Sequence, residues 1–190
     1  MSSTSAPFGL VPANHPSGVV RPFAMSILTG YATTIYANSP VKIISSSTGE
    51  GTIALAAPGD SFIGTFQGVE FTDSDGKRRV SNKWTASTAA TDIVAYVTID
   101  QSITYEIQSN AALAVTDIGK QYDFTAASGS TVTGLSSQML DVASAVTSGG
   151  TAGLRLIGIV PGPDNNWGDT YVNALVQIVE HQNTAVVNAY

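Results

Sequence analysis

The chain has 190 residues, of which 43% are hydrophobic and only 12% are charged, and its formal net charge is −6. This length allows a substantial buried core, but the charged fraction is about half of the roughly 25% typical of globular proteins. The acidic balance argues against a nucleic-acid partner, because phosphate binding needs clustered lysine and arginine. The absence of cysteine excludes disulfides and thiolate metal sites.

The scarcity of charge predicts a largely neutral exterior. Soluble monomers rarely leave large apolar patches uncovered, so we expect another copy or another surface to cover part of it. Residues 1–18 lack the basic start and apolar run of a signal peptide. No stretch approaches the ~20 apolar residues of a membrane-spanning helix. We therefore expect synthesis in the cytoplasm and no membrane partner.

Residues 1–20 form the first expected unit, an extended N-terminal docking arm. Proline removes amide donors and favours extended neighbours, and three prolines interrupt this segment: Pro7, Pro12 and Pro16. The apolar side chains expected to anchor it to a partner are Phe8, Leu10 and Val11. A disordered terminus is the alternative. Residues 21–190 are expected to form a single β-barrel or β-sandwich domain.

From residue 24 onward, short runs of β-branched and aromatic residues alternate with turn signals, a pattern typical of an all-β sandwich or barrel. The expected strands cover residues 31–36, 41–44, 62–71, 93–99, 103–108, 122–124, 139–142, 154–160 and 172–179. Interior glycines predict a bend in the strand of residues 62–71. One helical turn is expected at residues 116–119. The predicted fold is a compact all-β structure with an extended arm and little helix.

Residues 93–108 show the clearest alternation of apolar and polar side chains, which indicates half-buried strands. Asp100-Gln101 interrupts the alternation, so this region is either a hairpin or a corner. Residues 154–160 are apolar nearly throughout and are expected to be central and covered on both sides.

Few residues suit catalysis or metal binding, so we expect no enzyme activity, no cofactor and no metal. His15 and His181 have no neighbouring ligands in sequence, as a zinc site would require. No G-x-S-x-G motif marks a nucleophilic serine, although a triad assembled in space stays open. The segment 73–76 (Asp-Ser-Asp-Gly) is similar to the start of a calcium loop, but an ordinary Asp-Gly turn is the favoured interpretation.

Two segments supply further candidates for contact with a partner. Lys77, Arg78 and Arg79, followed by Trp84, form either a solvated hairpin tip or a positive patch that docks on an acidic neighbouring subunit. Trp167 lies in a polar loop, where it is either a lid over the core or an exposed contact anchor.

The opening Ser5-Ala6-Pro7-Phe8-Gly9-Leu10, followed by Val11-Pro12 and His15, resembles the start of capsid decoration (cement) proteins of tailed bacteriophages. Residues 117–120, 154–158 and 172–182 are also similar to that group, in the same order, whereas the tail of residues 183–190 departs from it. The resemblance implies a non-enzymatic virion protein on the exterior of an icosahedral capsid. It further implies the major capsid protein as partner and a homotrimer at local threefold positions.

Two other functions stay open. A carbohydrate-binding or adhesive module, such as a head fibre or tail accessory protein, would use Trp84, Trp167 and tyrosines as an exposed stacking platform flanked by amide and carboxylate side chains. A hydrolase would depend on His181. The decoration hypothesis expects that deleting residues 1–18 weakens capsid binding without unfolding the body.

Overall fold

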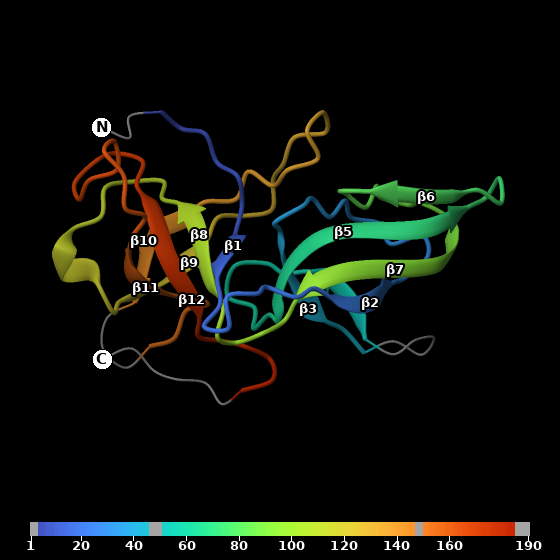
Figure 1. Cartoon of the computed structure of the whole chain (residues 1–190), viewed down its shortest axis with the longest axis horizontal. Coiled ribbons are helices and arrows are strands. Elements are labelled where there is room, and N and C mark those ends of the chain that lie inside the picture. Colours follow the sequence, from blue (N-terminus) through green and yellow to red (C-terminus); the bar gives the residue numbers. More distant parts are fainter. Residues whose placement is uncertain (1–3, 46–50, 147–149, 185–190) are drawn as a thin grey trace.

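The computed structural model describes residues 4–45, 51–146 and 150–184, and the fold is nearly all β, with 45% strand and 2% helix. The predicted all-β class is therefore confirmed. The strands form two six-stranded sheets that lie end to end along the long axis of the molecule (Figure 1).

The first sheet contains a closed five-stranded barrel. Its order is β3-β4-β2-β7-β5-β6, and a further pairing of β3 with β5 closes the first five strands. The five barrel strands are β2 (Phe23–Ile27), β3 (Pro40–Ile43), β4 (Thr52–Leu55), β5 (Gly64–Asp73) and β7 (Ala90–Thr98), and the sixth strand of the sheet, β6 (Arg78–Ser81), pairs only with β5. Apolar side chains fill the barrel, including the fully buried Phe66, Trp84 and Val97.

The second sheet is antiparallel throughout, in the order β1-β8-β12-β11-β9-β10. Its strands are β1 (Val11–Asn14), β8 (Thr104–Gln108), β9 (Gln121–Phe124), β10 (Leu140–Val146), β11 (Leu154–Ile159) and β12 (Asn173–Ile178). A separate core packs on one of its faces and contains Tyr105, Tyr122 and Phe124. A 3-10 turn, η1 (Val115–Asp117), confirms the short helical turn expected at residues 116–119.

Several local predictions need correction. Residues 31–36 form no strand; only Ile35 makes an isolated bridge, to Trp84, because this segment packs through its side chains into the barrel. Strand β11 is central in its sheet, as expected, but it is not covered on both sides, since Ile157 is 40% exposed. The expected bend in β5 is confirmed as a register shift between Phe66 and Gly68.

Residues 99–103 form a corner, and not a hairpin, because β7 belongs to the barrel and β8 to the second sheet. Buried hydroxyl groups join the two bodies beside this corner. The Oγ1 atoms of Thr65 and Thr98 lie 2.9 Å apart, and the Thr98 Oγ1 lies 3.4 Å from the Tyr105 hydroxyl. Burial raises the pKa of Tyr105 to about 12, so its hydroxyl stays protonated and neutral in this buried position.

Phe62 forms the apolar part of this junction. It precedes β5 of the barrel, yet its ring lies in the core of the second sheet, 5.4 Å from the ring of Phe124 and nearly perpendicular to it. The Phe62 N–H donates to the Glu180 carbonyl, and the Phe62 carbonyl accepts from the Gln182 N–H.

Barrel closure predicts a large effect of one substitution. Gly64 has φ +152°, and a Cβ there would lie 1.5 Å from the Thr98 carbonyl oxygen. We expect Gly64→Ala to lower the free energy of unfolding by at least about 3 kcal/mol in urea titrations. Gly158→Ala is the matched control, because a Cβ at Gly158 meets nothing within 4 Å, and it should be neutral or slightly stabilising. Equal stability of the two variants would contradict this account of closure.

Candidate functional site

The N-terminal segment lies against its own chain. Its strand β1 pairs antiparallel with β8 at the edge of the second sheet. The side chain of Leu10 is fully buried in the core there, and its N–H donates to the Asn38 carbonyl. Leu10 is therefore a core residue, which corrects the expectation that it anchors an arm to a partner. Phe8 and Val11 are half-buried, and their contact with a partner stays a prediction.

The two tryptophans, both expected to contact a partner, pack against the protein's own cores. Trp84 is fully buried in the barrel with its ring 5.5 Å from that of Phe71, so its expected role in contact is corrected. Trp167 is half-buried and packs against the core of the second sheet, while the next residue, Gly168, donates to the Leu113 carbonyl. Trp84 therefore cannot belong to an exposed stacking platform, whereas a contact role for the half-buried Trp167 stays a prediction.

The basic segment lies at the tip of the β5–β6 hairpin, and its arginines have partners in the same hairpin. Arg78 pairs with Glu70 at 3.1 Å, and Arg79 pairs with Asp73 at 3.2 Å. The side chains of both arginines are about half exposed, and Lys77 is exposed as well. The tip is therefore cationic at its surface but locally neutralised, and its docking on an acidic subunit stays a prediction.

The possible calcium loop is the turn of this hairpin. The Asp73 N–H donates to the Lys77 carbonyl, and Gly76, with φ +74°, donates to the Asp73 carbonyl. The Asp73 carboxylate accepts from the Ser74 N–H and pairs with Arg79, and these interactions lower its pKa. No group of three or more potential metal ligands occurs in residues 4–45, 51–146 and 150–184.

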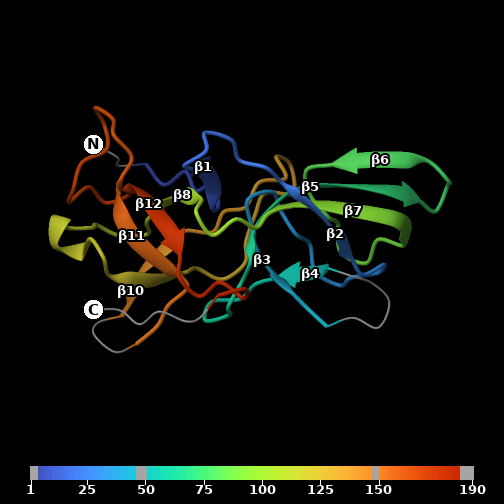
Figure 2. The ribbon, with the colours of Figure 1, turned by 60° about the horizontal axis from the view of Figure 1, so that its bottom comes forward.

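The most exposed large apolar side chains of the described chain lie close to this hairpin. Val132 is 93% exposed and Val80, on the edge strand β6, is 81% exposed. The Asn82 side chain donates to the Thr133 carbonyl, and the Lys83 ammonium donates to the Thr131 carbonyl. These bonds hold the loop of residues 125–137 beside the end of β6 (Figure 2). We call Val80, Val132 and the partly exposed Leu135 the β6 patch.

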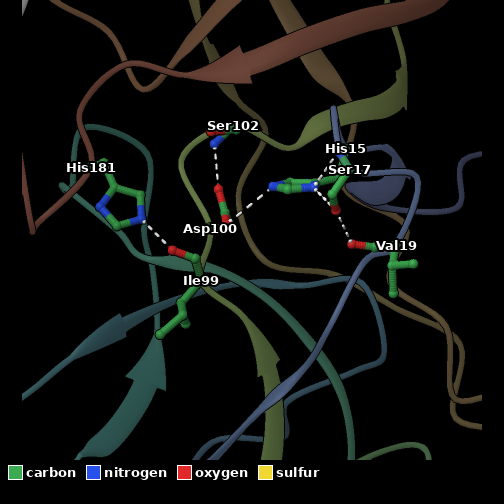
Figure 3. A network of polar contacts seen from close by, with 7 residues as sticks. All are labelled: His15, Ser17, Val19, Ile99, Asp100, Ser102 and His181. Atoms are coloured by element: carbon green, nitrogen blue, oxygen red, sulfur yellow. Dashed lines mark hydrogen bonds and ion pairs between the residues drawn. The ribbon is translucent and has the colours of Figure 1, made fainter.

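A polar network lies at the corner between the two bodies (Figure 3). His15 Nδ1 accepts the Ser17 N–H at 3.1 Å, so Nε2 carries the proton and faces the Asp100 carboxylate at 3.2 Å. The Ser17 Oγ lies 2.6 Å from the same Nδ1. Asp100 also accepts the Ser102 N–H, and these contacts hold the pKa of the Asp100 carboxyl below its ordinary value. The sequence reasoning missed this grouping because Asp100 is distant along the chain.

Serine, histidine and aspartate are the residue types of a hydrolytic triad, but the backbone donors of this turn are occupied. An oxyanion hole needs N–H groups that point at the reacting oxygen. The Ser17 N–H is bonded to His15 Nδ1, and the Gly18 N–H is bonded to the His15 carbonyl at 2.8 Å. The geometry therefore favours a structural role, in which the contact between His15 and Asp100 holds the N-terminal segment against the corner.

His181, the residue on which the hydrolase hypothesis depends, lies on the other side of Asp100 (Figure 3). Its Nδ1 accepts the Asn183 N–H at 3.2 Å, so Nε2–H donates to the Ile99 carbonyl at 3.1 Å. The side chain is buried, and burial lowers the pKa of His181 below its ordinary value. Both ring nitrogens are engaged by the backbone, so His181 supports the corner as a neutral residue.

Comparisons with known proteins identify no relative: no family model, no curated protein and no solved structure matches this chain. Within the described ranges, no helix is both long and apolar enough to cross a membrane. Residues 185–190, most of the tail that departs from the decoration proteins, lie outside the described residues.

The burial of Leu10 predicts that the N-terminal segment stabilises the body. Leu10→Ala should lower the free energy of unfolding by about 2–5 kcal/mol, the range for buried leucine. The control, Val132→Ala at the surface, should change it by no more than about 0.5 kcal/mol. Chemical denaturation measures both. The expectation that residues 1–18 can be deleted without unfolding the body is corrected for the same reason; stability unchanged by Leu10→Ala would reinstate it.

His181 predicts a pH dependence of stability. Its pKa is lowered in the folded state, so the unfolded chain binds the proton more readily, and stability falls as pH drops below about 6.5 toward the folded pKa. Proton NMR can assign the titrations, because the chain has only two histidines. His181→Gln should flatten this part of the stability profile. A His181 titration at or above about 6.5 would contradict the prediction.

Proposed function

We propose that this protein is a non-enzymatic structural component of a tailed-phage virion that binds the outside of the capsid. The observation that carries the proposal is the β6 patch, whose two valines are 93% and 81% exposed in a chain with only 12% charged residues. Covering such side chains is favourable by up to about 2 kcal/mol each. The major capsid protein is the proposed partner, and the chain is made in the host cytoplasm and ends in the virion.

The surroundings of the β6 patch suit a protein partner. Interfaces typically combine an apolar centre with a polar rim, and arginine is enriched in them. Here Arg78 and Arg79 directly precede Val80 on the same strand, and each guanidinium group is about half exposed. These cations would steer the patch toward an acidic surface and fix its orientation, while the valines supply most of the binding energy.

Other exposed apolar side chains support self-association, with a homotrimer as the proposed form. Val115 and Ile118 lie on and beside η1, and Ile157 lies on the outward side of β11. Strand β11 lies in the second sheet, at the end of the molecule away from β6 (Figure 1), and η1 belongs to the connection between β8 and β9 of that sheet. A protein that meets both a lattice and its own copies needs several such surfaces, and modest contacts repeated over a shell add up through multivalency.

The test is binding to capsids that lack this protein, measured by cosedimentation and by electron-microscopy maps with and without it. The wild-type chain should saturate the particles and add density outside the shell. Val132→Asp and Val80→Asp should each weaken binding about tenfold or more, because a carboxylate would be desolvated in the contact. Raising the salt concentration should slow association.

Val115→Asp is the matched control, since it places the same charge on an exposed valine near η1. It should leave the affinity of the particles for this chain unchanged, and it should affect self-association by light scattering if η1 lies between copies. Absence of binding to any capsid, together with a monomeric wild-type chain, would contradict the proposed function.

A further inference from the structure

A groove lies at the surface of the corner, beside the polar network of Figure 3. Its volume is about 390 Å³, and it shares Phe23 and Asp100 with an adjoining hollow of about 300 Å³. These volumes are at the lower end of the range for small-ligand sites. The lining comes from the N-terminal segment, from β2 and from the β7–β8 corner, so the groove exists only once both bodies have folded.

One wall of the groove is apolar and contains an aromatic ring. Phe23 begins β2 on the same face as Met25 and Ile27, which point toward the barrel core. Phe23 lies at the end of that strand, and it is 49% exposed and lines the groove. Val19, which is 52% exposed, and the fully buried Ile103 complete this wall.

The rest of the groove carries hydrogen-bonding groups. Asp100 is fixed by the Ser102 N–H and by His15, yet its side chain is 45% exposed and can accept further hydrogen bonds. Arg21 lines the same groove, and Gln101 lines the adjoining hollow. Carboxylate, guanidinium and amide groups are planar and offer paired atoms that match neighbouring hydroxyl groups.

From this juxtaposition we propose that the groove binds a hexopyranose unit of an oligosaccharide. The C–H face of the sugar packs on the Phe23 ring, and its hydroxyl groups bond to Asp100 and Arg21. A peptide is less suited to the groove, because peptide anchors fill pockets that become fully dry. Four of the seven residues that line this groove are polar, namely His15, Ser17, Arg21 and Asp100. The site does not depend on the capsid contact proposed above.

The experiment presents the purified full chain, clustered on beads, to an array of neutral and acidic glycans, followed by NMR titration with the best ligand. The wild-type chain should bind a subset of glycans. Phe23→Ala should weaken binding about tenfold or more, whereas Phe23→Tyr should retain it, because the ring is kept. Asp100→Asn should weaken binding too. Val80→Ala, in the β6 patch, should bind glycans like the wild type.

Thermal unfolding of each variant is the control that tests whether its fold is intact. Absence of binding to every glycan, or equal binding by wild type and Phe23→Ala, would overturn the proposal. If Phe23→Ala instead reduces self-association or capsid binding and no glycan binds, the groove is a protein contact and the proposal is wrong. Loss of capsid binding in the β6 variants with glycan binding intact would separate the two functions.

Discussion

The buried junction between the barrel and the second sheet is the interaction on which the rest of the structure depends. Phe62 precedes a barrel strand but packs in the core of the second sheet. The hydroxyl groups of Thr65, Thr98 and Tyr105 form a chain of polar contacts across the boundary. These hydroxyl groups are buried away from water, so a hydroxyl that lost its hydrogen-bond partner would destabilise the fold by its full desolvation penalty. The two bodies are thereby held in one arrangement, although most backbone pairing stays within each sheet.

This junction also explains where the polar side chains gather. The corner after β7 must leave one sheet and enter the other, and its backbone groups are satisfied locally by His181 at Ile99 and by Asp100 at Ser102. His15 then uses the same carboxylate to fasten the N-terminal segment. Both histidines therefore stabilise the corner, and the groove beside them lies where the N-terminal segment and β2 meet that corner.

The polar corner and the β6 patch offer different chemistry at the surface of the molecule. Serine and histidine meet at the corner, but the turn that holds them uses its own N–H groups, which leaves little for oxyanion stabilisation. The β6 patch, in contrast, exposes apolar side chains, and Val80 follows directly after two arginines that are paired with Glu70 and Asp73. This surface is the basis of the proposed contact with a capsid, and the half-exposed Phe23 is the basis of the separate glycan site that we propose at the corner.

The sequence by itself determined the all-β class and most strand positions, because alternation and turn residues are local properties. Single residues also predicted the bend in β5 and the interruption of the strand at Asp100. Only the tertiary structure decided that Leu10 and Trp84 are core residues, that His15 meets Asp100, and that Val80 lies near the loop containing Val132. Burial and pairing between distant segments depend on how the two sheets close and join, and no local pattern records that.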